Sequence, residues 1–272
     1  MSLTRIATNV EALWAYQALD KINNNISDVQ LQMSTGKKIN YSEDDPAGYQ
    51  LARGLERRER GLENALMNVT NAKSILNIAE GGYQNIMDIL QTIKEKATQA
   101  ADQALSSSQR TAINDQVSAL ITEVGDIVTE TTFNGSALIN GTFSGNFQVG
   151  EESSNTMAVS LLSASAASLS ISAVDVSTAS SANAAIATVS TSIDTLAGRV
   201  QDLGEYKSRL EFKEATLSVA ITNTQAIKSN VEDSDLVKNQ MELVKYQILQ
   251  QTAAAAFSQA NAAPQMVLKI MG

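Results

Sequence analysis

Residues 47–263 contain no proline, and a heptad pattern of apolar side chains opens this interval. Because proline breaks helices, its absence allows helices of unusual length. Apolar residues that alternate spacings of three and four form the seam along which coiled-coil helices pack. A helix continuous from Pro46 to Ala104 would be about 90 Å long at about 1.5 Å per residue. Its seam positions are Leu62, Ala65, Val69, Ala72, Leu76, Ala79, Tyr83, Ile86, Leu90, Ile93, Ala97, Ala100 and Ala104.

The start of this helix carries a capping signal. Asp44 and Asp45 precede Pro46, so a carboxylate can accept the first free amides while proline occupies the first helical position. We favour this cap over a metal site, because the residues that follow offer no further oxygen ligands at alternate positions. Within the helix, Gly81 and Gly82 should each weaken it by about 1 kcal/mol, so we expect a bend there.

The middle of the chain changes character twice. An amphipathic pattern predicts a second helix at about Ser108–Thr131, and Asn134-Gly135 and Asn140-Gly141 then indicate β-hairpins. From Ser153 to Ile193 the composition is rich in Ser, Thr and Ala, with Asp175 as the only charge. This stretch is interpreted as a short surface insertion or flexible outer segment, with display of O-linked sugars as the alternative. Helical pattern resumes near Ile193.

Both ends of the chain carry apolar stripes. A nearly uncharged, alanine-rich segment follows Leu249, and such a segment is explained best as a surface that something else covers. We therefore predict a mainly α fold: an elongated, hairpin-like helical rod or bundle with coiled-coil packing, a small β-hairpin element and a short outer insertion. The predicted subunit-packing residues are Leu19, Ile22, Ile26, Val29, Met33, Leu76, Ile86, Leu90, Ile93, Val244, Ile248 and Val267.

Composition excludes much chemistry. The chain has no histidine and no cysteine, which removes imidazole bases, thiol nucleophiles and the commonest metal ligands. A formal charge of −9 without a basic stripe argues against nucleic acid, and no apolar run is long enough to span a membrane. The first residues lack the apolar core of a secretory signal. We expect no enzyme activity, no catalytic residue, no cofactor and no metal.

Ordered sequence blocks resemble bacterial flagellins. They cover about residues 1–140 and 190–272, and together they are far more specific than any single block. The blocks are Leu31–Asn40, Asp44–Gly48, Ile75–Gly81, Thr132–Leu138, Ser229–Asp235, Lys245–Gln251, Ser258–Asn261 and Pro264–Leu268.

The resemblance implies a self-assembling filament subunit that is exported unfolded by the flagellar type III system. An export chaperone and a cap protein are implied as partners, and the terminal helices would line the inner tube. The implied segments are a polymerisation helix and linker at 1–42, helical rod at 43–142 and 193–233, a hairpin and outer segment at 143–192, and a polymerisation helix at 234–272.

Two departures from the family pattern qualify this implication. Pro46 stands where many flagellins have alanine, and proline also occurs there in the related hook–filament junction proteins, which are the alternative family reading. A soluble coiled-coil adaptor is a second alternative. Thr92 and Lys96 replace an arginine and a leucine that help flagellins engage the vertebrate innate receptor, so receptor binding should be weak.

Overall fold

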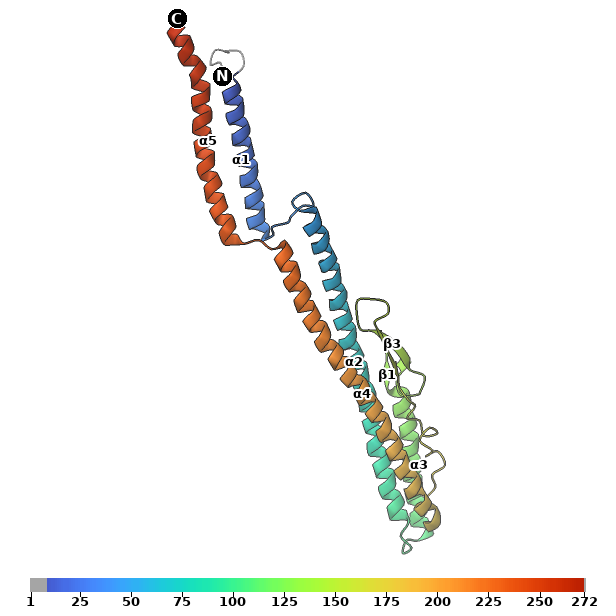
Figure 1. The fold of residues 1–272 in the computed structure, drawn as a ribbon. Coiled ribbons are helices and arrows are strands. Elements are labelled where there is room, and N and C mark those ends of the chain that lie inside the picture. The colour runs from blue at the N-terminus through green and yellow to red at the C-terminus, as the bar shows by residue number, and fades with distance from the viewer. Residues whose placement is uncertain (1–8, 272) are drawn as a thin grey trace. The chain divides into compact units, whose positions relative to one another are not determined.

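The structure, a computed structural model, describes the backbone of residues 9–271 and side-chain burial for residues 9–262. The mainly α fold class is confirmed (Figure 1). Two short two-stranded antiparallel sheets, β1–β2 and β3–β4, accompany the helices. The elements in chain order are α1 Val10–Thr35, α2 Pro46–Ala100, α3 Ser107–Glu130, β1 Thr132–Phe133, β2 Ser136–Ala137, β3 Ser144–Gln148, β4 Thr156–Ser160, α4 Ala179–Glu232 and α5 Leu236–Met271.

The chain divides into two compact units. One unit combines the two ends of the chain, up to Arg57 and from Asn223 onward, and the other is Arg58–Thr222. We call them the terminal unit and the central unit. The boundary between them falls within α2 and within α4.

In the central unit, the α2 seam forms the core with α3 and α4. Ion pairs Lys73–Glu214 and Glu80–Lys207, each 2.6 Å, show that α2 and α4 run antiparallel. Every predicted seam position from Leu62 to Ala100 is buried. Ala104 is exposed because the helix ends at Ala100, where the guanidinium of Arg110 donates to the Ala100 carbonyl at 3.0 Å.

The glycine pair does not break α2, which continues from Pro46 to Ala100. Gly82 is instead a close-packing position. A Cβ atom there would lie 2.7 Å from Thr131 Oγ1 and 2.9 Å from Ile139 Cδ1, whereas one on Gly81 would meet open space. The loss of helix propensity at Gly82 is therefore offset by tight contact with the segment that follows α3.

Turn chemistry explains the first hairpin. Asn134 and Gly135 both have positive φ, 49° and 78°, as the tight turn between β1 and β2 requires. The second predicted turn, Asn140-Gly141, precedes the β3–β4 hairpin, in which Ser144 pairs with Ser160 and Gln148 with Thr156.

The expected surface segment at 153–193 is wrong in part. Helix α4 begins at Ala179, well before Ile193, and the loop between β4 and α4 contributes buried side chains to the core. The hydroxyl of Tyr83 donates to the Leu162 carbonyl at 2.5 Å, and the guanidinium of Arg199 donates to the Ser163 carbonyl. The buried residues of this stretch are Met157, Val159, Leu161, Ala164, Leu169, Ile171, Val176, Ala182, Ala185, Val189 and Ser192.

In the terminal unit, α1 and α5 lie side by side and antiparallel (Figure 1). The predicted cap of α2 is present, since Asp45 accepts from the Gly48 amide at 3.0 Å. Helix α5 has a similar cap, in which Asp235 accepts from the Val237 amide at 2.9 Å. Asp44 has a different role, since it accepts from the Asn40 amide at 2.8 Å and orders the preceding turn.

Candidate assembly interface

Helix α5 presents two opposite faces, and the first lies against α1 of the same chain. The rings of Tyr16 and Phe257 are 6.1 Å apart, and the Gln250 amide donates to Asn23 Oδ1 at 2.7 Å. Positions on this face recur at spacings of four and three, as in a coiled coil, and all are buried or half-buried. They are Asn239, Leu243, Tyr246, Gln250, Ala253, Phe257 and Ala260.

The second face of α5 is apolar and exposed. Val237, Met241, Val244 and Ile248 are 71%, 63%, 45% and 59% exposed. At about 100° per residue they lie about 170° round the helix from the face that contacts α1. They also recur at spacings of four, three and four, so this face has the pattern of a second packing seam that nothing covers within the described residues. We call these four residues the outer seam of α5.

The predicted stripe of α1, unlike the outer seam of α5, packs against a helix of the same chain. It contains Val29, one of the two buried residues of α1, and it faces α5 of the same chain, which leaves its other members half-buried. Leu19, Ile22, Ile26, Val29 and Met33 therefore pack within the chain, and their predicted role between subunits is not needed to cover them. The exposed large apolar residues of α1 are instead Val10, Leu13, Trp14 and Tyr16.

Four further predicted subunit-packing residues are corrected. Leu76, Ile86, Leu90 and Ile93 have no exposed surface, because α3 and α4 of the same chain cover the α2 seam. They cannot contact another copy without unfolding the central unit. The side chain of Val267 lies outside the described residues, so of the predicted set Val244 and Ile248 are the exposed members.

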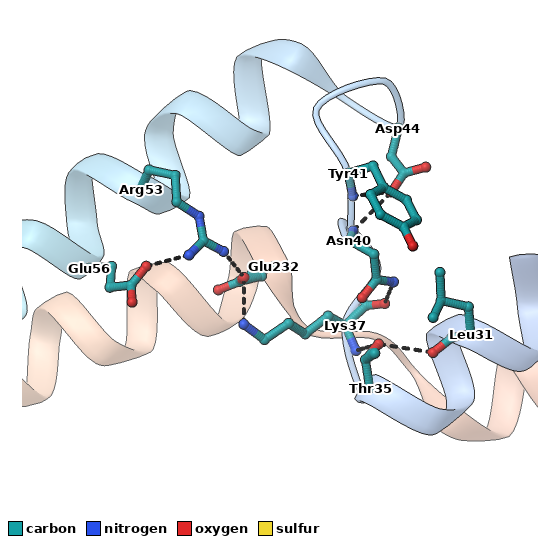
Figure 2. A network of polar contacts seen from close by, with 9 residues as sticks. All are labelled: Leu31, Thr35, Lys37, Asn40, Tyr41, Asp44, Arg53, Glu56 and Glu232. Carbon is teal, nitrogen blue, oxygen red and sulfur yellow. Dashed lines mark hydrogen bonds and ion pairs between the residues drawn. The ribbon is translucent and has the colours of Figure 1, made fainter.

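In the terminal unit, ion pairs to the buried Glu232 join the end of α4 to the segment after α1 and to the first turns of α2 (Figure 2). The Glu232 carboxylate is 2% exposed and accepts from Lys37 Nζ at 2.7 Å and from Arg53 Nη2 at 2.8 Å. The backbone adds two hydrogen bonds, from the Lys38 amide to the Glu232 carbonyl and from the Ser234 amide to the Gly36 carbonyl. These contacts fix the segment between α1 and α2 against the segment between α4 and α5.

Sequence reasoning missed this cluster of Lys37, Arg53 and Glu232. Its members are far apart along the chain and show no periodic pattern, so no sequence signal could have joined them.

The described residues contain no group of three or more acidic side chains placed to hold a metal ion. Among the same residues, no helix combines the length and the hydropathy needed to cross a bilayer.

Comparison with known proteins gives the family. Residues 6–144 match the bacterial flagellin N-terminal helical region, and residues 185–271 match the bacterial flagellin C-terminal helical region. Flagellin FlaB1 of Treponema pallidum is 30% identical over 97% of this chain and 98% of its own length. The flagellin of Listeria monocytogenes is 26% identical over 98% of this chain and 99% of its own length.

Two solved structures share the fold. Bacillus cereus flagellin has a TM-score of 0.51 at 21% identity, over 56% of this chain and 88% of that chain. A putative flagellar hook-associated protein from Vibrio parahaemolyticus has a TM-score of 0.60 at 12% identity, over 70% of this chain and 100% of that one. At these low sequence identities, the two structures show only that the fold is shared. The family matches, which cover most of the sequence, and the relative of 30% identity carry the conclusion that this chain belongs to the bacterial flagellin family.

Proposed function

We propose that this chain is a structural subunit that self-assembles into a flagellar filament, and that copies meet on the outer seam of α5. The observation that carries the proposal is the exposed seam of Val237, Met241, Val244 and Ile248, opposite the face that α1 already covers. A helix with apolar seams on two opposite faces needs a neighbour on each. The chain supplies one neighbour, and a second copy supplies the other.

Burial of apolar side chains drives this assembly. Each large apolar side chain that becomes covered contributes at most about 1.5–3 kcal/mol, before ordering and association costs are subtracted. Four such residues give at most about 6–12 kcal/mol per copy before those costs, and the contact is repeated along a polymer. Because the seam is apolar, assembly should strengthen in salting-out conditions.

The test places charge on the outer seam. Val244→Lys combined with Ile248→Lys should leave the monomer helical, since both side chains are exposed, and should abolish filaments in negative-stain micrographs after seeding. Gln247→Lys is the matched control, because Gln247 is also exposed and lies about 90° round α5 from the outer seam. Normal filaments from the doubly charged variant would overturn the proposal.

The finer family expectations belong to the same proposal. We expect export through the flagellar type III system with a chaperone and a cap protein as partners, and a filament surface formed by the middle of the chain. Val267 remains a proposed subunit-packing residue. Thr92 and Lys96 should make innate receptor activation weak, and a reporter assay giving the potency of a strongly stimulating flagellin would contradict this.

A further inference from the structure

A groove lies on the central unit between the antiparallel helices α2 and α4. Its volume is about 370 Å³. Met87 and Val200 form its apolar floor and are only half-buried, although both pack against the core. Ala197 also lines it, and the polar side chains of Gln84 and Asp88 complete the lining. The groove therefore offers an apolar floor with one negative charge at its edge.

The same unit also carries a protruding aromatic side chain. Phe212 of α4 is 73% exposed. An exposed phenylalanine is a strong anchor for a protein contact, because one ring buries a large apolar area with little loss of side-chain freedom. Other exposed apolar residues of this unit, such as Val219 and Met67, are smaller or more flexible and less exposed.

A chain cannot place its own Phe212 in its own groove. Phe212 and Val200 are both on α4, about 18 Å apart along the helix axis and about 120° apart round it. Groove and ring therefore point in different directions. A contact between two different patches of identical subunits does not close on itself in general, and it generates open helical polymers.

Opposite charges lie at the groove and beside Phe212. Arg209, three residues before Phe212, shares its helix face, while Glu211 and Lys213 flank Phe212 with opposite charges. Glu205 is on the same face, one turn from Arg209 and about two turns from Phe212. Within the described residues, neither Asp88 nor Arg209 forms an ion pair, so both charges are available to a neighbour.

We infer that the groove of one subunit receives Phe212 of a second copy of this chain, with Arg209 of that copy beside Asp88. This inference rests on the proposed function and adds a second interface, separate from the outer seam of α5. The two contacts use different units of the chain, so each can be broken without the other.

Cysteine cross-linking tests the contact directly, because the natural chain contains no cysteine. Two single variants, Phe212→Cys and Val200→Cys, are mixed in equal amounts, polymerised and oxidised. We expect a disulfide-linked dimer from the mixed filaments, and none from the mixed monomers or from either variant alone. Val219→Cys, exposed on the same helix, replaces Phe212→Cys as the matched control and should give no dimer.

Charge exchange is the second test and does not depend on polymerisation of the cysteine variants. Asp88→Arg and Arg209→Asp should each raise the critical concentration for assembly about tenfold, and the combination should restore most of the loss. Asp194→Arg, on an exposed site of α4, controls for net charge and should have less effect.

The outcomes separate the two proposals. Normal filaments without the dimer and without the charge rescue would overturn the groove contact and leave the proposed function intact. Failure of the unmodified chain to form filaments would contradict the proposed function and the groove contact together.

Discussion

At the scale of single residues, Tyr83 links the core of the central unit to pH. Burial raises the pKa of Tyr83 to about 12, with Asp202 adding to the rise and Arg199 opposing it. The folded state therefore holds the phenol proton more tightly than the unfolded chain, whose tyrosines titrate near 10. The resulting stability is complete below about pH 10 and disappears as the pH rises toward 12; it amounts to about 2–3 kcal/mol.

Tyr83→Phe should remove this part of the alkaline loss. At neutral pH the variant should be less stable by about 1 kcal/mol, because the Leu162 carbonyl loses its hydrogen bond. Urea unfolding followed by circular dichroism between pH 7 and 11.5 measures both effects. The natural chain should lose stability more steeply than the variant above pH 10, and equal slopes would refute the assignment.

For the ion pairs of Glu232, removal of the carboxylate and removal of its two cations should cost different amounts of stability. Lys37 and Arg53 are 41% and 43% exposed, so after Glu232→Gln they can be hydrated, and the loss should be about 1 kcal/mol. Lys37→Ala with Arg53→Ala instead leaves a buried carboxylate without its cations, at a cost of about 3 kcal/mol. Urea unfolding and hydrogen exchange at the Lys38 and Ser234 amides would show the difference. A larger effect from Glu232→Gln would contradict this account.

At the scale of elements, alanine substitutions at the two adjacent glycines of α2 should change stability in opposite directions. Gly81→Ala should stabilise the chain by about 0.5–1 kcal/mol, since its Cβ meets open space and alanine favours the helix. Gly82→Ala should destabilise it by about 1 kcal/mol or more, because Thr131 and Ile139 occupy the required space. Thermal unfolding of both variants tests the pair, and stabilisation by both would show that the contact at Gly82 is loose.

The elements that sequence reasoning found are those with large apolar side chains at regular spacing. The α2 seam and the helix at 107–130 were predicted almost to the residue. The first turns of α4 were missed because small residues form their seam. Ser192, for example, reads as polar but is buried, since its hydroxyl donates to the carbonyls of Leu169 and Thr188. A serine or threonine hydroxyl that donates to a backbone carbonyl can be buried, so a packing face made of such residues does not stand out in a hydropathy pattern.

At the scale of the whole molecule, a heptad stripe predicts that a face is covered but does not say which chain covers it. The stripe of α2 is buried by other helices of the same chain, and the stripe of α1 is half-buried against α5. The outer seam of α5 has the same spacing and remains exposed. Periodicity is identical in the two cases, because a helix packs against its own chain and against another copy by the same physics. The sequence could therefore predict which faces are packed, but not which of them pack within the chain and which pack between copies.

Deletion of residues 249–272 should separate folding from assembly. The deletion removes Phe257 and Gln250, which contact α1, but no residue of the central core. We expect a helical monomer that does not polymerise, with circular dichroism reporting the helices and negative-stain microscopy the absence of filaments. Filaments of normal appearance from the truncated chain would refute a role in assembly for the part of α5 from Leu249 onward; the outer seam, which the deletion retains, is tested by the lysine variants.

Solvent access at the outer seam measures directly whether neighbouring copies cover it. Ile248→Cys gives a single thiol on the seam, and Ser153→Cys gives one in the exposed turn between β3 and β4 as the control. Maleimide labelling rates are compared in monomers and in seeded filaments. We expect the thiol at position 248 to become at least about tenfold slower to label in filaments, because the seam is buried there, while the thiol at position 153 keeps its rate. Equal labelling of position 248 in the two states would contradict it.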